Sequence, residues 1–160
     1  MPYSETDNIT LTKLALISER ARKDPTFRFT SLAHLLNEGF LKECYFDLGR
    51  DRASGIDGVS WKEYGERLDE NISDLVARLK AKRYKPKPSR RVYIPKDEHS
   101  KRPLGLASLE DKIVQKGIAR IWEAIYEQDC LNCSYGFRPN CNCHQALNKV
   151  DCLASTINSL

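Results

Sequence analysis

Residues 89–106 read SRRVYIPKDEHSKRPLGL, and this stretch decides the fold. Two segments with strand-like residues, 91–95 and 101–106, lie on either side of a polar turn at 96–100. Valine, tyrosine and isoleucine suit a pleated, half-buried strand, and proline, which cannot donate to a ladder, is found at strand ends and edges. The pattern predicts a short, twisted hairpin with cations around its tip, a form suited to holding phosphates. From composition alone, a solvated basic loop is the alternative.

Positive charge is concentrated in and before this predicted hairpin. Eleven lysines and arginines fall between Arg78 and Arg102, against two acids, Asp97 and Glu98. This local excess of nine is larger than the net charge of +4 of the whole chain, so the rest of the chain is net acidic by five. Such an asymmetry indicates a polyanionic partner, most simply nucleic acid or nucleotide phosphates. Charge alone does not separate RNA from DNA, or either of them from a membrane surface.

Amphipathic spacing predicts helices on both sides of the hairpin. The predicted segments are 9–21, 32–48, 61–79, 109–127 and a last short helix from about 143. Thr30 or Ser31 is the expected cap of the second segment, and Ser108 the expected cap of the fourth. Ser60 and Glu63 form a capping-box pattern before the third segment. We expect the segment 109–127 to pack under the hairpin and hold its strands in register, which gives an α+β fold.

A turn is predicted at residues 54–58, which read SGIDG. Its two glycines can adopt positive φ. Asp57 has two interpretations, a metal-binding carboxylate or a turn residue that caps the backbone, and the second is the stronger one.

The sequence disfavours a membrane-spanning protein and a secreted protein. No apolar run approaches the ~20 residues that cross a bilayer, and the N-terminus MPYSETDNIT has neither the basic nor the apolar region of a secretory signal. We therefore expect a cytoplasmic protein with no membrane partner, whose six cysteines are reduced thiols.

A series of motifs follows this pattern along the chain. In order they are RFTSLAHLLNE, SGIDGVSW, RYKPKPSRRVYIPK, KRPLGL, LEDKIVQ and SYGFRP, the last followed by His144. In this order they resemble the N-terminal part of bacterial group II intron reverse transcriptases, also called maturases. The resemblance covers about residues 26–150, and a series of this length is far more specific than any one of its members.

The resemblance implies a right-hand polymerase fold. Residues 1–52 would form an N-terminal helical extension that binds template and intron RNA, and residues 53–160 would form the fingers and part of the palm. Members of the family transfer a nucleotide from a dNTP to a primer by two-metal chemistry, so the intact parent is expected to use Mg²⁺. The expected partners are RNA, as intron and as template–primer, and dNTP; the sequence does not fix the oligomeric state.

The motifs also imply roles for particular cations. Lys96 and Arg102 match the fingers residues that hold the dNTP triphosphate, for which a planar guanidinium fork and a mobile ammonium group are suited. Arg138 of SYGFRP matches a block near the template–primer path. The remaining cations are expected to contact the RNA backbone and to give affinity rather than sequence readout: Lys82, Arg83, Lys85, Lys87, Arg90 and Arg91.

Catalytic residues are not predicted within the 160 residues. The family's catalysis depends on carboxylates in a palm strand with the pattern Asp-x-x-x-Phe-Phe-Asp and in a later aromatic-x-Asp-Asp pair, and this chain contains neither. Asp151 lies in DCLASTINSL, which does not match, so no metal ligand is assigned to it. The chain by itself is therefore expected to be inactive. The matched region also departs from the family pattern at Ala107-Ser108, Asn140 and Cys141.

A second functional class is a non-catalytic basic RNA-binding protein, with or without a zinc site. Cys130, Cys133, Cys141 and Cys143 with His144 form C-x2-C-x7-C-x-C-H, in which the first pair has zinc-ligand spacing. Free thiols are the alternative, and the family folds through this region without a metal.

Overall fold

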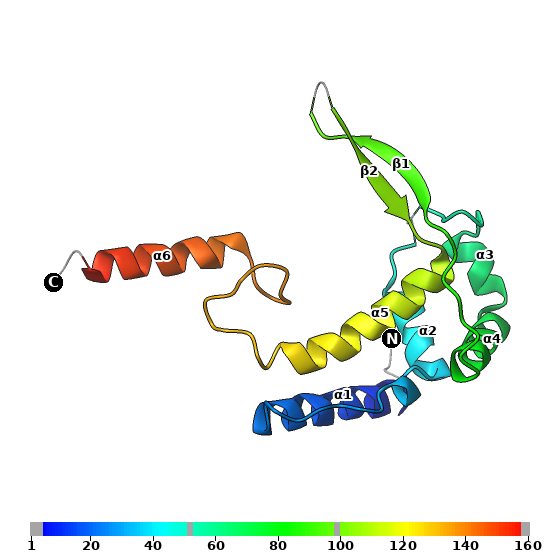
Figure 1. Ribbon diagram of the computed structural model, residues 1–160, viewed down its shortest axis with the longest axis horizontal. Helices are drawn as coiled ribbons and strands as arrows, with labels where there is room; N and C mark the ends of the chain where they lie inside the picture. Colours follow the sequence, from blue (N-terminus) through cyan, green and yellow to red (C-terminus); the bar gives the residue numbers. More distant parts are fainter. Residues whose placement is uncertain (1–4, 51–52, 98–99, 158–160) are drawn as a thin grey trace.

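The computed structural model describes residues 5–50, 53–97 and 100–157 as a helical body from which a β-hairpin and a C-terminal helix project (Figure 1). The elements in chain order are α1 (Glu5–Lys23), the 3₁₀ turn η1 (Ala33–Leu35), α2 (Glu38–Asp47), α3 (Trp61–Glu66), α4 (Leu68–Lys80), β1 (Arg90–Pro95), β2 (Lys101–Leu106), α5 (Leu109–Tyr126) and α6 (Cys143–Ile157). The α+β class predicted from the sequence is confirmed. Among the described residues, no helix is long and apolar enough to span a bilayer.

The hydrophobic core lies between α2, α4 and α5, with α1 against α2 and α5. Its fully buried side chains come from all three central helices: Phe40, Leu41, Cys44 and Tyr45 from α2, Ile72 and Leu75 from α4, and Ile113 from α5. Gly117 of α5 permits the close approach to α2, because a Cβ there would lie 3.0 Å from Leu36 Cδ2 and 3.3 Å from Leu41 Cδ2. The body is therefore held by apolar packing between sequence-distant helices.

The predicted caps of the second helical segment are wrong. Neither Thr30 nor Ser31 caps a helix; instead η1 begins after Leu32 without a side-chain cap, and α2 begins after Asn37. The side-chain oxygen of Asn37 accepts a hydrogen bond of 3.0 Å from the amide of Phe40. Asparagine is among the best N-cap residues, and Gly39 lies in the first turn of the helix.

The predicted helix 61–79 is two helices. The capping box at Ser60 and Glu63 is confirmed, but the backbone breaks at Arg67, with φ −127° and ψ 42°. The side-chain amide of Asn71 donates to the carbonyl of Tyr64 at 2.9 Å, so the break leaves this carbonyl satisfied. The first segment is fixed by the Tyr45 hydroxyl, which donates to the Trp61 carbonyl at 2.8 Å, whereas α4 is fixed by its own buried face.

The hairpin is confirmed, but its predicted contact with the following helix is wrong. Ser108 caps α5 as predicted, its Oγ accepting from the amide of Asp111 at 3.2 Å. Helix α5 packs on α1 and α2, whereas β1 and β2 contact mainly each other and extend away from the body (Figure 1). The strands are therefore kept in register by their own pairing and by the turn, not by a helix beneath them.

The turn of the hairpin is closed by local hydrogen bonds. The amide of Lys96 donates to the carbonyl of Ser100 at 2.9 Å. The carboxylate of Asp97 accepts from the amide of Ser100 at 2.8 Å and from its hydroxyl at 2.7 Å. These bonds extend the antiparallel pairing of Pro95 with Lys101 by one step.

The C-terminal helix is longer than predicted. It extends from Cys143 to Ile157, over 15 residues. Leu147, Val150 and Leu153 are exposed along it, and Figure 1 shows it apart from the helical body. The division of the chain at residues 52 and 53 stays a prediction.

Cys44 differs from the other five cysteines because its thiol is buried. Cys44 is fully buried, and its burial raises the pKa of the thiol to about 11, although the nearby Arg120 guanidinium opposes the shift. Since the thiolate is the reactive form, we expect Cys44 to react slowly with Ellman's reagent near neutral pH, while the other five cysteines, which are exposed or half-buried, react rapidly. Titration before and after denaturation measures this; six fast thiols in the native protein would contradict the packing of α2.

Candidate nucleic-acid interface

The register of the hairpin divides its side chains between two faces. Antiparallel pairing joins Val92 to Leu104, Tyr93 to Pro103 and Ile94 to Arg102, and side chains alternate between faces along a strand. We call the two sets the Arg102 face and the Tyr93 face. The Arg102 face contains Arg90, Val92, Ile94, Arg102, Leu104 and Leu106; the Tyr93 face contains Arg91, Tyr93, Pro95, Lys101, Pro103 and Gly105.

The two residues predicted to hold a triphosphate lie together. Because the pairing continues from Pro95 and Lys101 to the hydrogen bond between Lys96 and Ser100, the alternation puts Lys96 on the Arg102 face. Lys96 and Arg102 are thus neighbours near the tip of the hairpin, which projects from the body (Figure 1). Arg90 lies on the same face at the opposite end.

Most of the predicted RNA-contacting cations have no internal partner. Within the described ranges, no ion pair or side-chain hydrogen bond engages the following residues: Lys82, Arg83, Lys85, Arg90, Arg91, Lys96, Lys101 and Arg102. All of them are exposed. Exposed cations without protein partners remain available to phosphates.

The basic run before the hairpin begins with a sharp turn at the end of α4. Lys82 adopts φ +56°, and the amides of Arg83 and Tyr84 both donate to the carbonyl of Arg78, at 2.9 and 3.2 Å. This is the arrangement that usually has glycine at the left-handed position. The turn directs residues 83–89 back past the start of α5.

Lys87 is engaged differently from its neighbours. Its ammonium group lies 3.0 Å from Asp57 Oδ2, and its amide donates to Asp111 Oδ2 at 3.1 Å. Asp57 therefore pairs with a lysine side chain, and its other carboxylate oxygen is buried without a hydrogen-bond partner among the described residues, so the predicted capping of the backbone is not seen at this residue. Of the two glycines in that turn, only Gly58 has positive φ, +71°; a Cβ at Gly55 would lie 2.6 Å from the Cα of Ser108.

Arg138 is also engaged within the protein. Its guanidinium pairs with Glu127 at 2.6 Å and donates to the carbonyls of Leu131 and Ser134, at 2.9 and 2.8 Å. The hydrogen bond to Glu127 raises the pKa of Arg138 and lowers that of the carboxyl. These bonds organise the loop between α5 and α6, which is a structural role; the predicted contact with the template–primer stays a prediction.

Asp111 is the important residue that sequence reasoning missed. Only 3% exposed, its carboxylate accepts hydrogen bonds from the Tyr84 hydroxyl, from the Lys87 amide at 3.1 Å and from the Ser108 hydroxyl at 2.6 Å. Burial, and then the bond to this carboxylate, raises the pKa of Tyr84. An acid in the first turn of a helix is ordinary, so the neighbouring sequence does not indicate that Asp111 is buried and hydrogen-bonded. Its partners lie up to 27 residues away in the chain.

The cysteine alternative gains no support from the geometry. Cys130 and Cys141 are half-buried, and Cys133 and Cys143 are exposed. In the part of the chain that is described, no three His, Cys, Asp or Glu side chains come together as metal ligands. The zinc-binding version of the basic RNA-binding protein therefore has no formed site here.

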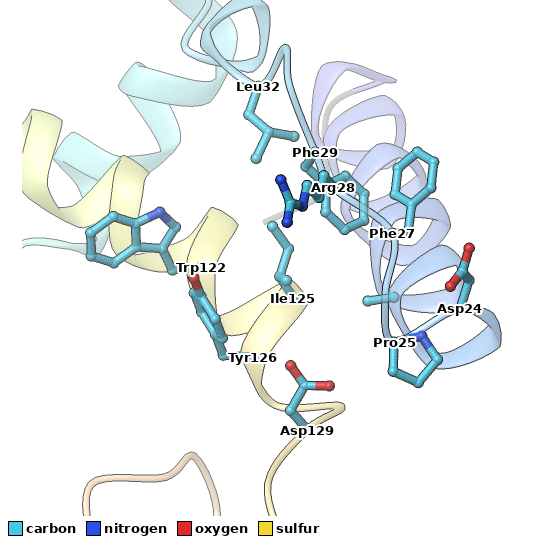
Figure 2. A pocket seen from close by; sticks show the side chains of 11 residues that line it. Asp24, Pro25, Phe27, Arg28, Phe29, Leu32, Trp122, Ile125, Tyr126 and Asp129 are labelled. Atoms are coloured by element: carbon cyan, nitrogen blue, oxygen red, sulfur yellow. The ribbon is translucent and has the colours of Figure 1, made fainter.

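A cleft that the sequence did not predict lies between the segment after α1 and the end of α5. It has a volume of about 390 Å³, and Phe27, Phe29, Trp122 and Tyr126 are among its lining side chains (Figure 2). Arg28 lies in the cleft with two acids, Asp24 and Asp129. Because its charges are mixed, the cleft does not extend the basic surface of the hairpin.

We expect removal of the buried carboxylate to loosen the hairpin base. Asp111→Ala leaves the amide of Lys87 and the hydroxyls of Tyr84 and Ser108 without their acceptor, which at ~1–3 kcal/mol for each unsatisfied group predicts a loss of about 3 kcal/mol in the free energy of unfolding. Tyr84→Phe, which removes one of these bonds, should cost about 1 kcal/mol. Urea denaturation measures both; equal stabilities of the two variants and the wild type would contradict the role of Asp111.

Comparison with known proteins relates this geometry to a family. No protein-family model matches the chain. Protein YkfC of Escherichia coli (strain K12) is 36% identical over 146 residues, which cover 84% of this chain and 38% of YkfC. The group II intron-encoded protein LtrA of Lactococcus lactis subsp. cremoris is 32% identical over 143 residues, 88% of this chain and 24% of LtrA.

A eukaryotic relative shows the same extent of similarity. An uncharacterized 91 kDa protein in a cob intron of Schizosaccharomyces pombe is 31% identical over 143 residues, 88% of this chain and 18% of that protein. The chain thus spans less than two fifths of the length of each of these three relatives. By its sequence, the chain belongs to the family of group II intron-encoded proteins, the reverse transcriptase and maturase family that its motifs resemble.

Proposed function

We propose that this chain is a fingers-type segment of an RNA-directed DNA polymerase, which binds the RNA backbone and the triphosphate of an incoming dNTP. The observation that carries the proposal is the shared face of Lys96 and Arg102 on a projecting hairpin. The family supports it, because the related protein LtrA is named as group II intron-encoded.

The triphosphate contact follows from the chemistry of the two side chains. Arg102 offers a planar fork to two phosphate oxygens, and Lys96 a mobile point charge to a third. With no carboxylate partner among the described residues, neither cation must first give up an ion pair. The nearest acid of the turn, Asp97, is engaged with Ser100.

The RNA contact follows from the distribution of unpaired cations. Lys82, Arg83 and Lys85 lie on the linker that leads to the hairpin, and Arg90 and Arg91 lie at its base. Cations spread along one path contact successive phosphates, and this gives affinity without sequence readout. Intron RNA and template–primer are the proposed RNA ligands.

Mg²⁺ belongs in this proposal only to the intact parent enzyme. The described residues do not bring three potential ligands together, so they do not fit a two-metal site and no chemical step is assigned to them. We propose that the 160 residues alone bind substrates without polymerising them. A non-catalytic basic RNA-binding protein is the competing function, and it differs in having no dNTP site.

The RNA proposal predicts binding that weakens steeply with salt. A triple variant with Lys82→Gln, Arg83→Gln and Lys85→Gln should reduce the slope of log affinity against log salt by about 2, from ~0.7 per phosphate contact on single strands. A charge-matched control replaces Lys13, Lys62 and Lys149, which are exposed outside the basic region, with Gln. Anisotropy titrations at several salt concentrations measure the slopes. A wild-type affinity for RNA that does not change with salt concentration would contradict the proposal.

The dNTP proposal predicts a selective kinetic defect. In an intact, polymerising protein that carries this segment, Lys96→Ala or Arg102→Ala should raise the KM for dNTP about 10- to 100-fold, from ~1.5–3 kcal/mol for a charged hydrogen bond. RNA affinity should change far less. Arg90→Ala, on the same face at the other end of the hairpin, is the matched control for the KM for dNTP, which it should leave unchanged. If both substrates were affected equally, the competing RNA-binding function would be favoured.

A further inference from the structure

The Tyr93 face of the hairpin carries an aromatic ring between two cations. Tyr93 is 58% exposed. Arg91 lies two residues before it on the same strand, and Lys101 lies across the hairpin opposite Pro95, one pair nearer the tip on this face. None of these three side chains has an internal ion pair among the described residues, and the face contains no acid.

The rest of this face has small or cyclic side chains opposite Tyr93 and Arg91. Pro103 lies directly opposite Tyr93, and Gly105 lies opposite Arg91. Gly105 puts no side chain opposite Arg91, and the nearest atoms to a Cβ built at Gly105 are Ser89 Cβ and Oγ, at 3.5 and 3.9 Å. Because residues two apart on a strand are about 7 Å apart, the backbone positions of Arg91 and Tyr93 are separated by roughly the thickness of two stacked aromatic planes.

The opposite face has a different character. Val92 and Ile94 are half-buried, and together with Leu104 and Leu106 they make the Arg102 face mainly apolar between its cations. The exposed aromatic ring is thus confined to the face that does not carry Lys96 and Arg102. An aromatic platform flanked by cations is the arrangement by which proteins bind single strands, with a base stacked on the ring and phosphates on the cations.

We propose that the Tyr93 face binds single-stranded RNA, with one unpaired base stacked on Tyr93 and the flanking phosphates on Arg91 and Lys101. The proposal rests on the RNA-binding function proposed above and adds a specific contact to it. The hairpin then has one face for the triphosphate and another for the strand. It binds an unstacked base, because a ring has no access to the face of a base inside a duplex.

The test replaces the ring without weakening the strand. Tyr93→Phe keeps the aromatic platform, and Tyr93→Thr removes it, and both replacements are good strand residues. The 160-residue chain is titrated with an unstructured RNA oligonucleotide that carries 2-aminopurine, and with a duplex of the same length. Circular dichroism and thermal melting verify that both variants fold.

The expected result is a loss of affinity for RNA with unpaired bases, and not for the duplex. Tyr93→Thr should weaken binding of the single strand by about 5- to 100-fold, from ~1–3 kcal/mol per stacked base, and should abolish the change in 2-aminopurine fluorescence. Tyr93→Phe should bind the single strand as the wild type does. For both variants, the affinity for the duplex and the salt dependence of binding should stay unchanged. Phe46→Ala, which removes a 64%-exposed aromatic ring on α2, is the control.

Three outcomes would overturn the proposal, and they are distinguishable. If Tyr93→Thr binds the single strand as tightly as the wild type, RNA binding stands but the stacking contact is wrong. An equal loss for single strand and duplex would mean that Tyr93 acts only through the shape of the hairpin. If the wild type binds no RNA even at low salt, the proposed function fails and this inference fails with it.

Discussion

The carboxylate of Asp111 is the interaction on which the candidate interface depends. It lies at the beginning of α5 and accepts hydrogen bonds from Tyr84, from the backbone of Lys87 and from Ser108. The first two belong to the linker that enters β1, and the third follows the end of β2. One buried acid therefore joins both ends of a hairpin that otherwise makes few contacts with the body. Satisfying three donors is also what makes a buried carboxylate tolerable, since an unpaired one would be strongly disfavoured.

The cations of this chain fall into two groups with different physical roles. Arg120 lies against Glu43 at 3.0 Å and over the ring of Phe40, and Arg138 organises the loop after α5. Their charges are used inside the protein, where partners compensate the loss of hydration. Apart from Lys87, which pairs with Asp57, the cations of the hairpin and its linker lack such partners within the described ranges, and their surplus is what a polyanion would neutralise. Both the family and this distribution of charge support the proposed binding of nucleic acid.

Sequence reasoning succeeded where the signals were local. The hairpin, the capping box at Ser60 and the cap at Ser108 are each determined within a few residues, and all three are confirmed. It failed where a distant partner decides the structure. The predicted single helix 61–79 is broken at Arg67, where α3 and α4 contact α2 separately, and the engagement of Lys87 depends on Asp57 and Asp111. The motifs already paired Lys96 with Arg102, but that the two share one face follows from the register, which a composition pattern does not provide.

A hairpin that is fastened only at its base behaves as a lever. Its six-residue strands extend over about 20 Å at ~3.3 Å per residue, so a tilt of about 10° at the base moves the tip by about 3 Å, the length of a hydrogen bond. Small rearrangements around the start of α5 would thus be amplified at Lys96 and Arg102. The position of these two cations is therefore set far from the cations themselves, by a buried part of the helical body.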